Sequence, residues 1–209
     1  MNSSHAGYGW NTSEAPHTCA YLLPEVLATL GRVGSKRILD LGSGNGNLSR
    51  RLADLKYDVV GVERDGEGID RSRLLAPKVP FHQYAVEDDP SLLMRGEAPF
   101  DTVISTEVIE HLFSPALLPR YAHAVLEAGG HLIVTTPYHG YVKNLALSLA
   151  DKWDHHHTVW WEGGHIKFFS RATLTQLLQD NGFDVVDFNG VGRLPWLWKS
   201  MIVTARKRA

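Results

Sequence analysis

A glycine-rich turn is the part of this sequence best suited to hold a ligand. Residues 38–46 begin as an apolar run and end with glycines at positions 42, 44 and 46. Glycine has no Cβ and tolerates positive φ, so the backbone of such a turn approaches a ligand closely. Asp40, at the end of the apolar run, offers a carboxylate to the turn or to a cationic ligand group. The stretch predicts a site for a nucleotide-like cofactor.

A second set of reactive side chains lies in residues 107–111, which contain two carboxylates and an imidazole. On a helix, positions i, i+3 and i+4 share a face, so Glu107, Glu110 and His111 would point at one spot. Such a set suits a divalent metal, Mg²⁺ or Zn²⁺, or a general base. The less specific interpretation is that Glu107 caps the helix while Glu110 and His111 orient a neighbouring loop.

Strand and helix patterns alternate along the chain and must position these residues. We expect strands over residues 37–41, 57–63, 79–85, 100–105, 130–136, 183–188 and 201–205. We expect helices over residues 17–30, 48–55, 68–75 and 171–181, and a helical region over 107–127 interrupted near Pro115 and Pro119. This order predicts a mainly parallel sheet covered on both faces, with the last two strands as an antiparallel pair at its edge.

The residues after the turn and the spacing of its glycines indicate which kind of cofactor site this is. The second strand ends at Glu63, 21 residues after Gly42, as expected when a carboxylate binds ribose hydroxyls. A nicotinamide dinucleotide site prefers Gly-x-Gly-x-x-Gly, which would need a glycine at Asn47. The chain has Gly-x-Gly-x-Gly instead, which disfavours a nicotinamide-dependent oxidoreductase.

The combination of Asp40, the three glycines and Glu63 resembles the class I S-adenosylmethionine-dependent methyltransferases. Residues 100–111 are similar to a segment of the ubiquinone-biosynthesis O-methyltransferases, where Glu-x-x-Glu-His follows a Phe-Asp-x-Val strand. The resemblance implies an α/β, Rossmann-like fold with a seven-stranded, mostly parallel sheet, helices on both faces and an antiparallel edge strand. It also implies S-adenosylmethionine as cofactor, which has no pyrophosphate and therefore needs acids and turn amides.

The same resemblance carries over to individual cofactor contacts, with the turn expected at the amino-acid part and Glu63 at the ribose. The expected cofactor-binding residues are Asp40, Gly42, Ser43, Gly44, Gly46, Glu63, Arg64, Val86 and Thr106. The acid that relatives place after the third strand is displaced or replaced in residues 84–88. In the ubiquinone-type relatives, an arginine upstream of the first strand helps to hold the carboxylate of the cofactor. Residues 17–30 of this chain contain no arginine, which leaves His17 or Tyr21 as substitutes.

The 3′-end RNA 2′-O-methyltransferases carry a similar segment, and a downstream histidine completes their metal site. His165 stands at the corresponding place in this chain. This resemblance implies Glu107, Glu110, His111 and His165 as metal ligands, with Glu110 and His111 as the catalytic residues. In those families the metal lowers the pKa of the acceptor hydroxyl. Many related methyltransferases carry the segment without a metal, so both alternatives stay open.

A long connection over residues 138–164 follows the fifth strand, and we expect it to build the acceptor pocket as a lid. Its first part is amphipathic at helical spacing, and its second part is rich in tryptophan and histidine. The expected pocket residues are Tyr138, His139, Trp153, Trp160 and Trp161. Such a lid suits a flat or apolar acceptor and would allow peripheral membrane contact. The alternative is an insertion that packs on the domain without a ligand.

Composition is that of a single globular enzyme domain of 209 residues, with a loose arm expected over residues 1–16 and the domain over 17–209. The net charge of -2 argues against DNA as a partner and disfavours RNA. The single cysteine excludes an internal disulfide and suits the cytoplasm. The predicted function is S-adenosylmethionine-dependent methyl transfer to a small molecule, with oxygen as the expected acceptor atom. The alternatives are a metal-dependent RNA ribose 2′-O-methyltransferase, a nicotinamide-dependent oxidoreductase and a catalytically idle cofactor-binding protein.

Overall fold

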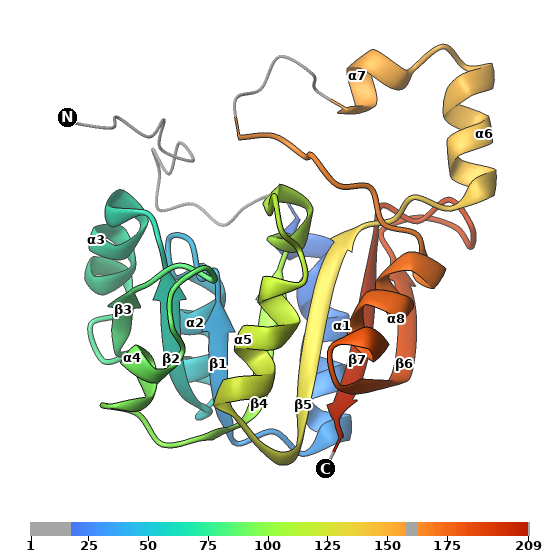
Figure 1. Ribbon diagram of the computed structural model, residues 1–209. Helices are drawn as coiled ribbons and strands as arrows, with labels where there is room; N and C mark the ends of the chain where they lie inside the picture. Colours follow the sequence, from blue (N-terminus) through green and yellow to red (C-terminus); the bar gives the residue numbers. More distant parts are fainter. Residues whose placement is uncertain (1–17, 158–162, 209) are drawn as a thin grey trace.

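The computed structural model describes residues 18–157 and 163–208, which contain a seven-stranded sheet (Figure 1). Its strands are β1 (Arg37–Leu41), β2 (Asp58–Glu63), β3 (Phe81–Gln83), β4 (Phe100–Thr106), β5 (Leu126–Pro137), β6 (Phe183–Val191) and β7 (Ser200–Lys207). They lie in the order β3-β2-β1-β4-β5-β7-β6, and β7 runs antiparallel to both of its neighbours. The predicted fold is confirmed. The antiparallel strand lies one place inside the edge, and β6 is the edge strand itself.

Helices cover both faces of this sheet, as predicted (Figure 1). The helices are α1 (Cys19–Val33), α2 (Asn47–Asp54), α3 (Gly66–Leu75), α4 (Ser91–Met94), α5 (Leu117–Val125), α6 (Tyr141–Leu149), α7 (Trp153–His157) and α8 (Arg171–Asp180), with a 3-10 turn η1 at Ile109–His111. Apolar residues of α1, α2 and α3 form one buried cluster, and those of α5 and α8 form another. The sheet therefore separates two cores.

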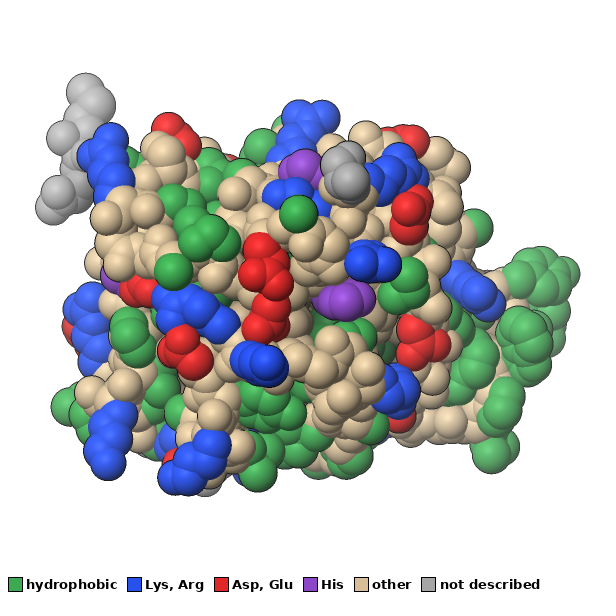
Figure 2. Space-filling view, turned by 90° about the horizontal axis from the view of Figure 1, so that it is seen from below, with side chains coloured by type: hydrophobic (Ala, Val, Ile, Leu, Met, Phe, Trp, Pro, Cys, Tyr) green, Lys and Arg blue, Asp and Glu red, His purple; other side chains and the backbone are tan. Residues whose placement is uncertain are grey.

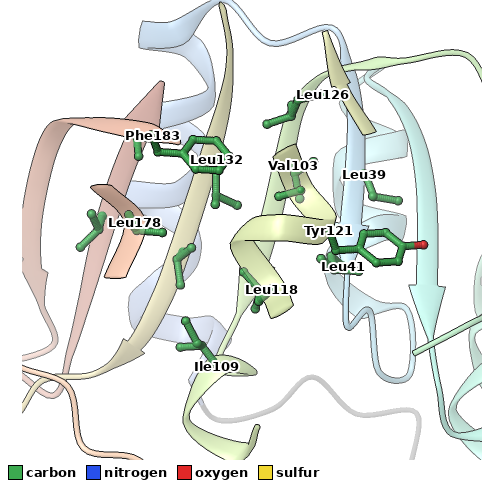
Figure 3. Close-up of a cluster of buried hydrophobic side chains, with 14 of the residues drawn as sticks. Leu39, Leu41, Val103, Ile109, Leu118, Tyr121, Leu126, Leu132, Leu178 and Phe183 are labelled. Carbon is green, nitrogen blue, oxygen red and sulfur yellow. The ribbon is translucent and has the colours of Figure 1, made fainter. Parts of the chain in front are cut away.

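Neighbouring strand residues point to opposite faces and so divide between the two cores. Ile38 belongs to the cluster under α1, whereas Leu39 belongs to the cluster under α5. In Figure 3 the side chains of Leu118 and Tyr121 on α5 lie over this second face. Strands buried on both faces read as continuous apolar runs, which is why their positions were predictable from sequence.

The predicted helical region over residues 107–127 is the main element that the sequence analysis placed wrongly. Its helical structure is limited to the turn η1 and the helix α5, and its last two residues belong to β5. Glu107 lies before both helical elements with φ of +54°. Pro115 precedes α5 and Pro119 lies in its first turn, where a missing N–H costs little. The prediction that Glu107, Glu110 and His111 share a helix face is therefore wrong. Their arrangement depends on tertiary contacts.

Helices α6 and α7 stand beyond the carboxyl ends of the parallel strands (Figure 1). The first part of the predicted lid is thus helical, as its periodicity indicated. On the opposite face of the molecule, Figure 2 shows basic and acidic side chains interspersed rather than a field of one sign. Across the described residues, no helix combines the length and the apolar character that a bilayer crossing requires.

Candidate active site

A cavity of about 940 Å³ opens at the carboxyl ends of the strands, where open α/β sheets bind their ligands. One end is lined by the glycine turn and the ends of β2 and β4, and the other by residues of α6, α7 and the β6–β7 connection. Side chains of α1 and α2 close the side of the turn. The cavity therefore joins the two groups of residues that the sequence singled out.

The glycine turn is shaped by backbone conformations that other residues rarely adopt. Gly42, Gly44 and Gly46 all have positive φ, and the amides of Gly42 and Ser43 donate to the Val62 carbonyl at 2.8 and 2.9 Å. A Cβ on Gly42 would lie 2.5 Å from a methyl group of Val108. The turn is thus fastened to β2 and fitted against the segment that follows β4.

Glu63 is fixed at the rim of the cavity by two backbone amides. The amide of Gly44 donates to one of its carboxylate oxygens at 2.9 Å, and the amide of Asp65 donates to the other at 2.9 Å. Its side chain is buried yet lines the cavity. Burial raises the pKa of Glu63, and these amides oppose that shift. Each oxygen keeps a lone pair with which to accept a ligand hydroxyl.

Two of the predicted cofactor residues, Asp40 and Gly46, do not line the cavity and instead make contacts that hold the glycine turn in place. Asp40 is buried and accepts a hydrogen bond from the Ser49 hydroxyl at 2.6 Å, and burial raises its pKa to about 6. Gly46 packs on α3, where a Cβ would lie 2.6 Å from that of Ser72. The predicted residues that do line the cavity are Gly42, Ser43, Gly44, Glu63, Arg64, Val86 and Thr106.

Arg51 is a lining residue that the sequence analysis missed. It projects from α2 near Cys19 of α1, and its buried Nε has no partner among the described residues. The expected arginine was sought upstream of β1, in the segment that contains Tyr21. Helical spacing carried a usable signal, because Arg51 lies three positions after Leu48, which also lines the cavity. His17, the other suggested substitute, lies outside the described residues.

Glu107 lines the cavity but is held by hydroxyl groups. Thr135 donates to one carboxylate oxygen at 2.9 Å, and Ser200 donates to the other at 3.2 Å. Burial raises the pKa of Glu107 to about 7, against the lowering effect of these two hydroxyls. The residue is therefore a carboxyl group poised near neutral pH inside the cavity.

Three of the four predicted metal ligands come together. Ligand atoms of Glu110, His111 and His165 lie within 4.8 Å of one another, and the rings of the two histidines are 4.9 Å apart. Glu107 is not part of this group, because Thr135 and Ser200 hold its carboxylate elsewhere. The structure thus places the fourth predicted ligand apart from the other three.

The geometry of the three side chains fits a cation. Glu110 is fully buried; Thr136 donates to one carboxylate oxygen at 3.0 Å, and the other oxygen has no described partner. His111 Nδ1 lies 2.7 Å from the Gly163 carbonyl, so that nitrogen carries the proton and Nε2 presents the lone pair. Burial lowers the pKa of His111, and that of His165 to about 4. One carboxylate and two neutral imidazoles suit Mn²⁺, Fe²⁺ or Zn²⁺ better than Mg²⁺.

Of the predicted acceptor-pocket residues that the structure describes, one lines the cavity. His139 lines the cavity, whereas Tyr138 packs against Trp198 and Trp153 donates from its indole to Ser148 at 2.7 Å. Trp160 and Trp161 lie outside the described residues. The lining residues that the sequence analysis missed at this end include Lys143, His156, His157, Arg193 and Lys199.

Comparisons with known proteins agree with this geometry. The family described as "Methyltransferase domain" matches residues 12–187. Ubiquinone biosynthesis O-methyltransferases of Cereibacter sphaeroides and Roseobacter denitrificans are each 31% identical over 78% of this chain. The chain spans 66% of the length of these relatives.

Solved structures share the fold at low sequence identity. Magnesium protoporphyrin IX methyltransferase from Synechocystis, with bound S-adenosylhomocysteine, gives a TM-score of 0.67 at 18% identity, covering 90% of this chain and 82% of that one. A 1,6-didemethyltoxoflavin-N1-methyltransferase from Burkholderia thailandensis gives 0.63 at 19% identity, covering 89% and 77%. Family match, relatives and fold lead to one conclusion: the chain belongs to the class I S-adenosylmethionine-dependent methyltransferases.

Proposed function

We propose that this protein transfers the methyl group of S-adenosylmethionine to an oxygen atom of a small-molecule acceptor. The observation that carries the proposal is the single cavity, in which the glycine turn and Glu63 share walls with Glu107, His111 and His165. The name of the 31% identical relatives, O-methyltransferase, supports oxygen as the acceptor atom. The cavity volume of about 940 Å³ lies within the range of small-molecule sites, which supports a small acceptor.

The residues at the turn end would bind the methyl donor. The Glu63 carboxylate would accept hydrogen bonds from the two ribose hydroxyls, and Val86 would pack against the adenine. Arg51 would pair with the carboxylate of the amino-acid part, which is the role left open by the missing upstream arginine. Thr106 lies at the end of β4, between this half of the cavity and the acceptor half. The methyl group would then face Glu107 and the histidines.

Transfer requires an oxygen nucleophile and a group that takes its proton. In the proposed step the acceptor hydroxyl gives its proton to the carboxylate of Glu107, which the Thr135 and Ser200 hydroxyls hold in place. The freed oxygen pair forms the new bond to the methyl carbon. The carbon–sulfur bond breaks in the same step, and its electron pair returns to sulfur, so that neutral S-adenosylhomocysteine leaves. Enclosing this exchange away from water strengthens the attraction between oxyanion and sulfonium.

Glu110, His111 and His165 would hold a divalent cation, with Glu110 and His111 keeping the catalytic importance that the sequence predicted for them. When bound, this cation would polarise the acceptor hydroxyl and favour its ionisation. The protein's own contribution is to orient the ligands. The Gly163 carbonyl fixes the His111 tautomer, and the Thr136 hydroxyl orients the Glu110 carboxylate by donating a hydrogen bond to it.

Binding of S-adenosylhomocysteine tests the donor half. Isothermal titration should show saturable binding to the wild type, and Glu63→Gln and Arg51→Met should each weaken it by about tenfold or more, because each removes a charged hydrogen-bonding partner. Arg50→Met is the matched control, since Arg50 lies next along α2 and pairs with Asp54 in solvent. The absence of wild-type binding would overturn the proposed function.

Metal binding is tested separately from the donor. Zn²⁺ and Mn²⁺ should bind the purified protein with one-to-one stoichiometry in the absence of any other ligand. His165→Ala should weaken binding by about tenfold or more, because it removes one of three ligands. Glu107→Gln should retain one-to-one metal binding, since Glu107 supplies none of the three ligands. Equal metal affinity in wild type and His165→Ala would exclude the site and leave the histidines with a positioning role.

A further inference from the structure

Lys143 is the one buried lysine or arginine in the part of the chain that the structure describes. It lies on α6, its side chain is 4% exposed, and it lines the cavity. Its Nζ donates a single long hydrogen bond, of 3.4 Å, to the Lys199 carbonyl. No carboxylate of the described residues forms an ion pair with it. A buried ammonium group without a counter-ion is costly, so such groups are normally paired.

Two further cations line the same end of the cavity. Arg193 and Lys199 both come from the connection between β6 and β7, and both are exposed residues. Neither forms an ion pair with a described residue, and the Lys199 Nζ lies 5.2 Å from the centre of the Tyr21 ring. Burial and the field of Arg193 lower the pKa of Lys143 to about 8, and Glu107 opposes this only in part. Like charges gathered in a cavity repel one another. An anion placed among them would relieve that repulsion.

The position of these cations assigns them to the acceptor side. Lys143 follows β5, and Arg193 and Lys199 precede β7, whereas the turn and Glu63 belong to β1 and β2. In the order β3-β2-β1-β4-β5-β7-β6, the two groups lie on opposite sides of β4 (Figure 1). Arg51, which lines the donor half, is the proposed partner of the one anionic group of S-adenosylmethionine. The cations beyond β4 are therefore left for the second substrate.

We propose that the methyl acceptor carries an anionic group, a carboxylate or a phosphate, and that Lys143 binds it together with Arg193 and Lys199. The inference rests on the proposed function, because the residues of the methyl donor define which space belongs to the acceptor. An oxyanion at Lys143 gains a charge-assisted hydrogen bond to a buried ammonium group, and the exposed Arg193 and Lys199 add cationic partners from the solvent side. An acceptor of the same shape without the charge leaves the buried ammonium unpaired and is rejected on that account.

Ligands matched in shape but not in charge test the proposal on protein saturated with S-adenosylhomocysteine. Benzoate should bind at least about tenfold more tightly than benzamide in isothermal titration, because only benzoate pairs with the cations. Phenyl phosphate and inorganic phosphate are titrated in parallel. Tighter binding of phenyl phosphate than of benzoate would identify a phosphate as the group, and the reverse order a carboxylate. Either order supports the proposal.

Substitutions at Lys143 separate this role from others. Lys143→Met should abolish the preference for benzoate while leaving S-adenosylhomocysteine affinity unchanged, and Lys143→Arg should retain a preference. Lys152→Met, on the exposed end of the same segment, should behave as wild type. The methionine variant is expected to fold, with a higher melting temperature than the wild type when no ligand is present, because it no longer buries an unpaired charge.

Three results would overturn the proposal. One is equal binding of benzoate and benzamide to the wild type, or no saturable binding of any of the anions. A second is an unchanged preference in Lys143→Met. The third is a loss of S-adenosylhomocysteine affinity in Lys143→Met of the size seen in Arg51→Met, which would assign the lysine to the methyl donor. A wild type that binds no S-adenosylhomocysteine would refute the proposed function instead, and this first titration keeps the two failures distinct.

Discussion

Glu107 is a carboxyl group that the fold holds inside a cavity, and no lysine, arginine or histidine of the described residues forms an ion pair with it. Its backbone has positive φ, which costs a non-glycine residue roughly 1 to 3 kcal/mol, and the cost is met by the contacts that fix its side chain. Those contacts come from Thr135 on β5 and Ser200 at the start of β7. Strain retained at such a position is typical of residues that serve the site rather than stability.

Replacing Glu107 by glutamine should change the pH dependence of stability in a defined direction. Burial raises the pKa of the folded carboxyl from 4.5 to about 7. The folded protein therefore binds more protons than the unfolded chain between these values, and this contribution to stability is lost as pH rises from 4.5 through 7. Glu107→Gln should lose less unfolding free energy between pH 5 and pH 8, by roughly 1 to 3 kcal/mol.

Urea unfolding at the two pH values measures this difference, and single-turnover methyl transfer provides the functional readout. The variant should bind S-adenosylhomocysteine normally and transfer methyl slowly, because glutamine cannot take the proton of the acceptor. Identical pH dependence in the wild type and the variant would show that Glu107 does not titrate in this range. Full activity would exclude it as proton acceptor.

Among the elements, the glycine turn between β1 and α2 is the one whose shape depends most on residue type. Gly46 has φ of +78°, and a Cβ there would lie 2.6 Å from the Cβ and 2.9 Å from the Cα of Ser72 on α3. Gly34, which ends α1, has φ of +73°, but nothing lies within 4 Å of a Cβ added there. The two glycines share a conformation and differ in their surroundings.

Alanine at these two positions separates conformational strain from close packing. Gly34→Ala should cost about 1 to 2 kcal/mol of unfolding free energy, the price of the left-handed conformation alone. Gly46→Ala should cost roughly 1 to 3 kcal/mol more, because backbone atoms of α3 must also move. It should weaken S-adenosylhomocysteine binding, whereas Gly34→Ala should not. Denaturant titration measures the first quantity and calorimetry the second; equal losses at the two positions would show that α3 yields without cost.

Elements that are specified by patterns in their own sequence could be predicted, whereas those that depend on contacts with distant residues could not. The strands β1, β2 and β4 follow from continuous apolar runs, and α2 from the turn that precedes it. Residues 107–127 were misjudged because Glu107 is fixed by Thr135 and Ser200, contacts that helical periodicity does not reveal. Lys143 escaped notice for a similar reason. Its helix was predicted, but its burial depends on the connection between β6 and β7.

At the scale of the whole molecule, one sheet supports both halves of the cavity. Other walls come from helices on one face of the sheet and from the lid beyond the strands. Helices α1 and α2 on one face contribute Tyr21 and Arg51, and the lid beyond the strands contributes His139 and Lys143. Strand β7 links the two, since Ser200 at its start hydrogen-bonds to Glu107 and lies 3.2 Å from the hydroxyl of Tyr21. The membrane contact expected of the lid stays a prediction, in keeping with the exposed Tyr141 and Leu149 on α6.

The late position of β7 in the chain has a consequence for the order in which the parts of the site are made. A ribosome completes β7 after every other strand of the sheet, yet this strand supplies Ser200 to the carboxylate of Glu107. Until then β5 and β6 have no common neighbour, because β7 pairs with both. A nascent chain that already contains the glycine turn, Glu63 and the histidines therefore still lacks a finished site. A chain that stops before β7 thus lacks the Ser200 hydroxyl that holds the Glu107 carboxylate.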